Sequence, residues 1–254
     1  MPPSPFDLSG RRILITGSNG GLGLAIAGGL AAMGASVVLN GRDAAKLRAA
    51  AEGLRGAGLA VEEARFDVAS EAEVDAAVDA LEALGPIDVL INNAGIQRRA
   101  RLDEIGLDAW DEVLRTNLTS AMLVARRASR GMIARGRGKV VNICSVMSEL
   151  GRTTTGAYAA AKGGLKMLTR AMCADWGPLG IQANAIGPGY FATDMTRALV
   201  DDPAFHAWVS NRTPARRWGR PEELVGAAAF LSSAASDYVN GQILYVDGGL
   251  TAVI

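Results

Sequence analysis

The sequence has few of the residues that build metal sites, disulfide frameworks and hydrolase triads. Its 254 residues include one histidine, His206, and two cysteines, Cys144 and Cys173. A single histidine leaves no histidine-rich zinc site and argues against a Ser-His-Asp triad, so we expect no bound metal. Two cysteines cannot form a disulfide framework, which favours a reducing, cytoplasmic location.

The chain also lacks an excess of either charge, because 26 basic side chains balance 26 acidic ones. This balance gives no electrostatic footprint for nucleic acid or for an anionic membrane surface. No apolar run approaches the length of a membrane span, and Met1–Pro5 has neither a basic nor an apolar segment of a signal peptide. We therefore expect neither a nucleic acid nor a membrane as a partner.

What the chain does have is a large apolar fraction arranged in a repeating order. Apolar residues make up 49% of it, and no linker or internal repeat divides it, which predicts one domain over residues 1–254. Short β-branched runs, apolar at consecutive positions as in strands buried on both faces, alternate with alanine-rich helical stretches. The predicted strands are 12–16, 36–40, 60–66, 88–92, 139–145, 182–186 and 242–246. The predicted helices are 22–33, 43–56, 70–84, 108–134, 156–176 and 221–234. The alternation predicts an α/β fold whose mostly parallel sheet is covered on both faces, with ligands beyond the carboxyl ends of its strands.

A glycine-rich turn follows the first predicted strand. Gly17 permits the sharp turn, Gly21 lets a phosphate approach the backbone, and Gly23 lets the next helix pack on the strand. The N-terminus of that helix offers free N–H groups and a positive dipole end to a pyrophosphate. A strand, this turn and a helix in succession predict a dinucleotide site. Its predicted contacts in the turn are Gly17, Ser18, Asn19, Gly21, Leu22 and Gly23.

The second predicted strand ends in Asn40-Gly41-Arg42, without a carboxylate. A dinucleotide fold that selects NAD usually carries Asp or Glu there, whereas a guanidinium can pair with a 2′-phosphate. Arg42 therefore favours NADP(H). NAD(H) stays open, because Arg42 could also be a solvated loop residue.

A tyrosine and a lysine four residues apart suggest acid–base chemistry. Tyr158 and Lys162 share one face of the predicted helix 156–176, which can bring the ammonium near the phenol. A free tyrosine titrates near pH ~10, and a neighbouring cation favours its ionised form. Ser145, at the end of a predicted strand, could hold a substrate oxygen while Tyr158 exchanges the proton. The Tyr-Lys spacing alone would fit a surface pair, so the prediction depends on the combination with Ser145 and the glycine turn.

Two segments rich in asparagine complete the pattern. Asn92-Asn93-Ala94-Gly95 closes the fourth strand, where backbone and amide groups could face the cofactor. Asn117 lies inside a helical stretch, where it either binds a water linked to Lys162 or points to solvent.

Together these residues resemble the short-chain dehydrogenase/reductase family from about Leu8 to Ile254. The matching elements are Thr16–Gly23, Asp67, Asn92–Gly95, Asn117, Ser145, Tyr158, Lys162, Pro188-Gly189, Thr193 and Val246-Asp247-Gly248-Gly249. The resemblance implies a three-layer Rossmann fold with a seven-stranded parallel sheet and helices on both faces. It also implies assembly, as a homotetramer or a dimer, and we expect a homotetramer.

The same resemblance implies a role for each matching residue. Tyr158 would be the acid and base, and Lys162 would lower its pKa and hold the nicotinamide ribose. Ser145 would position the reacting oxygen, and Asn117 would support a proton-relay water. The remaining cofactor contacts implied are Asp67 and Val68 beside the adenine, Asn93, Ala94 and Gly95, and Pro188, Gly189 and Thr193 beside the nicotinamide.

A narrower resemblance is to gluconate 5-dehydrogenases, which interconvert D-gluconate and 5-keto-D-gluconate, generally with NADP(H). The segments that carry it are 93–99, 142–145, 148–152, 188–193 and 212–219. It implies an oxidoreductase that interconverts a secondary alcohol and a ketone on a sugar acid, under a lid at about 190–215. Arg98, Arg99, Arg101 and Arg152 lie in loops near the expected site, where at most one or two should touch the substrate. The substrate contacts predicted are Ser145, Tyr158, Arg98, Glu149, Arg152 and Tyr190.

Some features leave alternatives open. Asn19 stands where NADP-dependent relatives often carry Arg, and Met147 stands where gluconate-type relatives tend to carry Gln. The substrate could be another carbonyl compound: a 3-oxoacyl thioester, a deoxyketo sugar acid or another ketone. A non-catalytic nucleotide-binding protein is a further alternative. The apolar segment 238–254 either forms a subunit interface or packs on its own domain.

Overall fold

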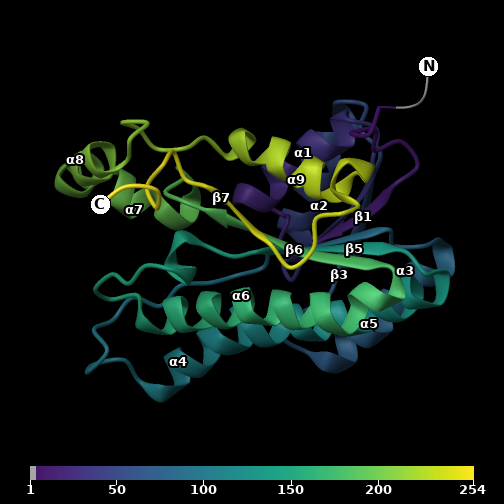
Figure 1. Cartoon of the computed structure of the whole chain (residues 1–254), viewed down its shortest axis with the longest axis horizontal. Helices are drawn as coiled ribbons and strands as arrows, with labels where there is room; N and C mark the ends of the chain where they lie inside the picture. Colours follow the sequence, from purple (N-terminus) through teal and green to yellow (C-terminus); the bar gives the residue numbers. More distant parts are fainter. Residues whose placement is uncertain (1–3) are drawn as a thin grey trace.

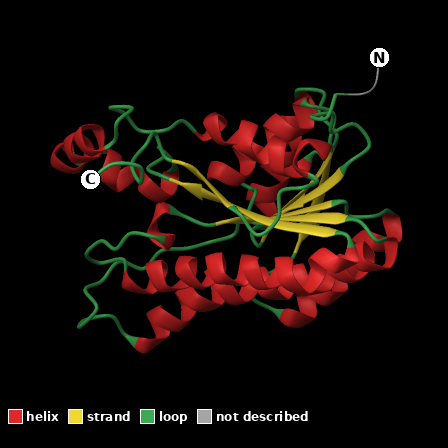
Figure 2. Cartoon of the chain, viewed as in Figure 1, coloured by secondary structure: helices red, strands yellow, loops and turns green. Residues whose placement is uncertain are grey.

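The computed structural model describes residues 4–254, which contain one sheet of seven parallel strands between layers of helices (Figures 1 and 2). The strand order is β3-β2-β1-β4-β5-β6-β7. The strands are β1 (Arg12–Ile15), β2 (Ser36–Gly41), β3 (Val61–Arg65), β4 (Val89–Asn92), β5 (Gly138–Ile143), β6 (Ile181–Pro188) and β7 (Ile243–Val246). The predicted Rossmann fold is confirmed. Residues 1–3, part of the segment expected to carry no signal peptide, lie outside the described residues.

The helices cover the two faces of the sheet in separate groups (Figure 1). One group is α1 (Gly21–Ala32), α2 (Ala44–Gly56) and α9 (Val225–Ser232). The other is α3 (Glu71–Leu84), α5 (Ser120–Arg135) and α6 (Gly156–Trp176), with α4 (Leu107–Leu114) leading into α5. Among residues 4–254, none of the helices combines the length and apolar character needed to span a bilayer.

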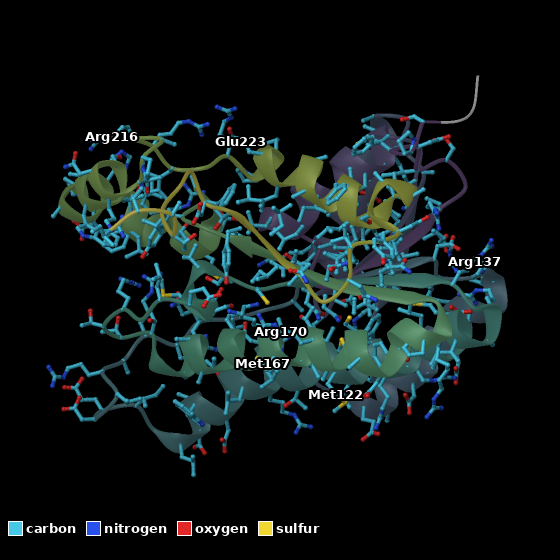
Figure 3. All side chains as sticks on the ribbon, viewed as in Figure 1. Met122, Arg137, Met167, Arg170, Arg216 and Glu223 are labelled. Atoms are coloured by element: carbon cyan, nitrogen blue, oxygen red, sulfur yellow. The ribbon has the colours of Figure 1, made fainter. Side chains whose placement is uncertain are left out.

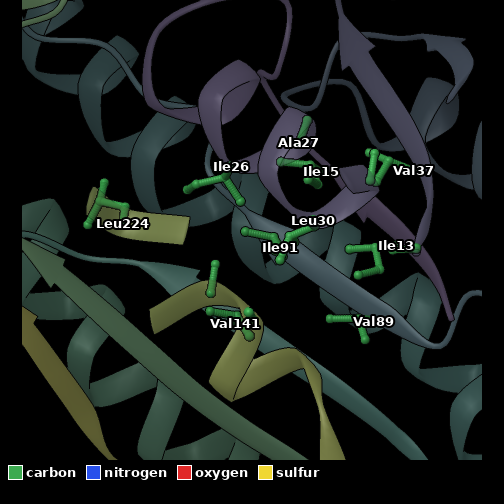
Figure 4. Packing of buried hydrophobic residues seen from close by; sticks show 14 of the residues in the cluster. Ile13, Ile15, Ile26, Ala27, Leu30, Val37, Val89, Ile91, Val141 and Leu224 are labelled. Atoms are coloured by element: carbon green, nitrogen blue, oxygen red, sulfur yellow. The ribbon is translucent and has the colours of Figure 1, made fainter. Parts of the chain in front are cut away.

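Consecutive apolar residues of β1 explain why helices have to cover both faces of the sheet. Ile13 and Ile15 pack with Ile26 and Leu30 of α1 (Figure 4), whereas Leu14 packs into the cluster on the opposite face. All these side chains are fully buried. Because both faces are closed by helices, the edge formed by the carboxyl ends of the strands is left for a ligand.

One predicted helix is interrupted in the structure. The pattern predicts one helix over 108–134, but α4 and α5 are joined by a turn of π-helix, η1 (Arg115–Thr119). Asn117 supplies a physical reason, since its Nδ2 donates to the Val113 carbonyl at 2.8 Å. That carbonyl is the one an α-helix would pair with the backbone N–H of Asn117. Such π-turns are frequent at functional sites.

A helical excursion follows β6. It contains η4 (Asp194–Thr196), α7 (Arg197–Val200) and α8 (Pro203–Arg212), and the chain returns at η5 (Pro221–Leu224). Arg216, in this excursion, and Arg137, before β5, lie at opposite ends of the molecule (Figure 3). This excursion contains the segment predicted to be a lid.

Candidate active site

A cleft of about 600 Å³ opens at the carboxyl ends of the strands. It lies where β1 and β4 are neighbours and the chain leaves the sheet in opposite directions, the place at which such sheets bind ligands. Its lining includes most predicted cofactor residues: Gly17, Asn19, Gly21, Leu22, Gly23, Arg42, Asp67, Val68, Asn93, Ala94, Gly95, Tyr158, Lys162, Pro188, Gly189 and Thr193. Ser18 is the exception. It is fully buried, and its Oγ donates to the Ile15 carbonyl at 2.7 Å, so it supports the turn from behind.

The glycine turn has the geometry that a pyrophosphate needs. Gly17 has φ +60°, and a Cβ there would lie 2.8 Å from the Cα of Ala94. A Cβ on Gly23 would lie 2.4 Å from the Asn93 Nδ2. At Gly21, φ is +55° and a Cβ would meet nothing within 4 Å, so its backbone faces open space. Because α1 begins without a side-chain cap, its first N–H groups are free for an anion.

Asn93 lines the cleft and also supports the glycine turn by hydrogen bonds. Its Nδ2 donates to the carbonyls of Thr16 and Gly17, each at 2.9 Å. Its backbone N–H donates to the Thr16 hydroxyl at 3.0 Å. The end of β4 therefore fixes the shape of the glycine turn.

Basic side chains border the far end of the cleft. Arg42 lies 3.5 Å from the Asp67 carboxylate, and its side chain remains 68% exposed. Lys46, in the first turn of α2, also lines the cleft. Sequence reasoning missed Lys46, because Arg42 precedes the helix and no regular spacing joins the two residues. Asn19 packs over Gly41, where a Cβ would lie 2.7 Å from its Nδ2.

Ser145, Tyr158 and Lys162 meet inside the cleft. The Lys162 Nζ lies 5.7 Å from the centre of the Tyr158 ring and donates to the Ile143 carbonyl at 2.6 Å. The Ser145 Oγ accepts from the Met147 N–H at 3.1 Å. The predicted proximity of ammonium and phenol is therefore present.

The charges of this group are governed mainly by burial. Burial raises the pKa of Tyr158 to about 12, and the hydrogen bond with Ser145 opposes that rise. Burial lowers the pKa of Lys162 to about 8. The protein's own groups therefore do not bring the pKa of Tyr158 down, and a phenolate at neutral pH needs additional positive charge nearby.

The side chain of Asn117 is largely used within the protein. It donates to the carbonyls of Ile96 and Val113 and accepts from the Ile96 N–H at 3.1 Å. Its Oδ1 keeps one acceptor position, and Asn117 and Thr116 of the π-turn line the cleft, so the predicted role of Asn117 in binding a relay water stays a prediction.

The structure does not bring Arg98 and Glu149 to the cleft, although both were predicted as substrate contacts. The Arg98 guanidinium forms two hydrogen bonds of 2.8 Å to Glu112 of α4. The Glu149 carboxylate pairs with Lys166 and accepts from the Tyr245 hydroxyl at 2.8 Å. Local ion pairs thus satisfy both side chains.

Arg152 and Tyr190, the other two predicted contacts, come together with Arg99. Burial raises the pKa of Tyr190, and the charges of Arg152 and Arg99 oppose that rise. The pKa of Arg99 is lowered by burial and by the charge of Arg152. Within residues 4–254 neither arginine forms an ion pair, and the Arg152 Nε and Tyr190 hydroxyl are buried without a partner. Two cations and a free phenol therefore converge without an anion, an arrangement that suits a carboxylate.

We call Arg99, Arg152 and Tyr190 the carboxylate cluster, after the group that they are suited to bind. Three loops at one edge of the sheet bring them together. The loop after β4 pairs with the start of α6 through a bridge between Ala100 and Thr155. Arg152 lies in the loop between Ser145 and α6, and Tyr190 directly follows β6. None of the three lines the cleft itself, but the loops that carry them leave the same edge of the sheet as residues that do, because Arg152 follows Ser145 in its loop and Tyr190 follows Gly189.

Several known proteins are similar to this chain in sequence and fold over nearly their whole lengths. A family model described as "Enoyl-(Acyl carrier protein) reductase" matches residues 17–251. Gluconate 5-dehydrogenase of Gluconobacter oxydans is 54% identical over 250 residues, which cover 98% of both chains. The 2-dehydro-3-deoxy-D-gluconate 5-dehydrogenase of Formosa agariphila is 50% identical, over 98% of this chain and 96% of that protein. The crystal structure of a gluconate 5-dehydrogenase from Burkholderia cenocepacia, in complex with NADP and tartrate, is 56% identical, covers 98% of each chain and has a TM-score of 0.96.

Proposed function

The chain belongs to the short-chain dehydrogenase/reductase family of NAD(P)-dependent oxidoreductases, and we propose that it interconverts D-gluconate and 5-keto-D-gluconate with NADP(H). The observation that carries this proposal is the carboxylate cluster, which is, among the described residues, two arginines without an ion pair and a free phenol in the loops that follow β4, β5 and β6. A sugar acid brings the anion that Arg99 and Arg152 lack and an acceptor for the Tyr190 hydroxyl.

Each residue of the catalytic group has a definite task in this proposal. Ser145 holds the reacting oxygen by a hydrogen bond, and Tyr158 takes the hydroxyl proton in oxidation and returns it in reduction. Lys162 keeps two of its three N–H donors for the ribose hydroxyls of the cofactor, since one is used by Ile143. The bound cofactor supplies the hydride acceptor or donor and, when oxidised, a positive ring.

NADP(H) is the proposed cofactor because of the charges at the far end of the cleft. Arg42 and Lys46 both line it, and the exposed guanidinium of Arg42 is free to turn toward a 2′-phosphate. The relative from Burkholderia cenocepacia is itself a complex with NADP. We expect Arg42→Ala to raise the Kd of NADP⁺ at least tenfold more than that of NAD⁺, measured by titration of the isolated protein.

Assembly and location are also part of the proposal. We propose a homotetramer in the cytoplasm, supported by exposed apolar side chains on the edge strand β7 and at the C-terminus. Leu244 is 41% exposed and Val253 48%, whereas Leu250 is buried within its own chain. Sedimentation of the purified protein tests the assembly, and a single 26 kDa species would contradict it.

A second candidate reaction has a substrate that is also a sugar acid. The relative from Formosa agariphila is a dehydrogenase of 2-dehydro-3-deoxy-D-gluconate, and the carboxylate cluster suits that acid equally well. Steady-state rates with D-gluconate, 2-dehydro-3-deoxy-D-gluconate and a neutral ketone separate the candidates.

The decisive variant is Tyr158→Phe. It should reduce turnover of D-gluconate with NADP⁺ by at least about 100-fold and leave the Kd of NADP⁺ within twofold, because only the exchangeable proton is removed. Unchanged turnover would refute the assigned role of Tyr158. No turnover by the unaltered protein on any acid tested would refute the proposed function itself.

A further inference from the structure

The lid helix α8 touches the carboxylate cluster through two aromatic side chains: Trp208 packs against Tyr190 with ring centres 5.8 Å apart, and Phe205 also reaches Arg152. The Cζ of Arg152 lies 5.0 Å from the centre of the Phe205 ring. Phe205 in turn packs against Tyr190, with ring centres 5.6 Å apart, and against Trp208 at 5.3 Å. One phenylalanine of the lid therefore contacts two members of the cluster.

The backbone that carries Arg152 is held in an unusual turn. Thr155 donates to the Arg152 carbonyl through its hydroxyl at 2.8 Å and through its N–H at 3.3 Å. Between them Thr154 has φ +66°, a left-handed conformation that is rare for a β-branched residue. Such conformations persist where the surroundings fix them, often near ligands. This turn fixes the base of the Arg152 side chain, and Phe205 contacts its charged end.

We propose that Phe205 is a positioning residue that makes the site selective for acids, by holding the guanidinium of Arg152 toward a carboxylate. This inference rests on the proposed function to the extent that the substrate is an acid. An aromatic ring against the face of a guanidinium leaves its N–H edge free, and that edge is the part that binds a carboxylate by two parallel hydrogen bonds. The Arg152 Nε is buried and has no hydrogen-bond partner in the described part of the protein, so this part of the edge is unsatisfied.

Contacts other than those of Phe205 also hold α8 on the protein. The buried residue of α8 is Val209, and Arg212 near the end of the helix donates to the Val253 carbonyl at 2.8 Å. His206, the next residue, stacks on Trp218 with ring centres 6.0 Å apart and serves as a matched control on the same helix.

The test is a double-mutant cycle with binding and kinetic readouts. In the complete protein with NADP⁺, Phe205→Leu should raise the KM and Kd of D-gluconate about tenfold and leave kcat within about twofold. In the Arg152→Ala background, Phe205→Leu should have no further effect. Phe205→Tyr, which keeps a ring, should restore the affinity, and His206→Leu should remain additive with Arg152→Ala.

Tartrate, measured by calorimetry, separates this inference from the proposed function. If the unaltered protein does not oxidise D-gluconate but binds tartrate with the same dependence on Arg152 and Phe205, the proposed function is wrong and the inference stands. An equal effect of Phe205→Leu with and without Arg152 would overturn the inference, because Phe205 would then act through packing. Absence of binding of both acids would also overturn it.

Discussion

Two lysines, Lys139 and Lys162, are equally buried, each 3% exposed, but their surroundings differ. Lys139 lies in β5, and its Nζ pairs with Asp237 at 2.8 Å. Two further acceptors, the Gln182 Oε1 at 3.1 Å and the Ser236 Oγ at 3.2 Å, complete its hydrogen bonds. Lys162, in the cleft, donates to the Ile143 carbonyl, its one hydrogen-bond partner within residues 4–254.

This difference separates a structural lysine from a functional one. An ammonium has three donors, and a buried one costs free energy unless it is paired and hydrogen-bonded. Lys139 meets that requirement within the protein, whereas Lys162 leaves two donors unused. Burial lowers the pKa of both, but only for Lys139 does a carboxylate, Asp237, oppose the shift. Of these two lysines, the one whose charge is undercompensated is therefore the one that lies where a ligand can complete it.

The largest expected effect is on turnover. Lys162→Met should lower kcat/KM for D-gluconate by about 1,000-fold, because the ammonium proposed to hold the cofactor ribose, and so to place the positive nicotinamide ring beside Tyr158, is removed. Lys139→Met, the matched control, should stay within about threefold of the unaltered protein. Steady-state assays with NADP⁺ measure both. Equal losses in the two variants would erase the proposed distinction.

The same two variants should act on stability in opposite directions. Lys139→Met leaves Ser236 and Gln182 without their donor and should lower the free energy of unfolding by about 2 kcal/mol; the loss is limited because Asp237 is 63% exposed and can be hydrated. Lys162→Met replaces a buried cation by an apolar side chain of similar length and should raise the free energy of unfolding by about 1 kcal/mol. Urea unfolding at pH 7 without cofactor measures both, and changes of equal sign would contradict the prediction.

Sequence reasoning could separate these lysines only through their neighbours. Lys162 stands four residues after Tyr158 on a helix, a spacing that fixes a shared face. The partners of Lys139 lie 43 and 97 residues further along the chain, so no local pattern indicates them. The strands were predictable within two residues at each end because most of them are apolar at consecutive positions and buried on both faces, independently of loop detail.

The loops show why the rest of the candidate site could not be predicted from the sequence. Arg98 and Arg99 are adjacent, and the first was predicted to reach the substrate. In the structure Arg98 is bound by Glu112, fourteen residues on, which leaves Arg99 beside Arg152. The direction of a loop side chain is decided by such tertiary partners. The π-turn at Asn117 depends likewise on contacts with Ile96, 21 residues earlier. The catalytic and substrate roles themselves stay predictions.

A further effect, of the same size as the loss expected for Lys139→Met, is a difference in pH dependence that isolates Lys162. Its pKa is about 8 in the folded protein, against an ordinary value of 10.5 for lysine, so the unfolded chain holds the proton over a range in which the folded chain has lost it. Below pH 8 both states are charged and the full cost of the buried cation is present. From pH 8 to 10 the folded state loses its proton, the cost is relieved, and stability rises with pH by about 2 kcal/mol relative to Lys162→Met.

The contribution of Lys139 cancels in this comparison, because both proteins retain it. Tyr158, whose pKa is raised to about 12, contributes with the opposite sign from about pH 9 upward, where a tyrosine of the unfolded chain begins to ionise, and this contribution cancels likewise because both proteins retain it. Urea unfolding of the unaltered protein and of Lys162→Met at pH 7, 8, 9 and 10 gives the difference directly. Lys166→Met, which removes a lysine paired with Glu149 near the surface, is the control and should leave the pH profile unchanged. Parallel profiles for the unaltered protein and Lys162→Met would show that Lys162 is compensated as fully as Lys139, and the distinction between the two lysines would fail.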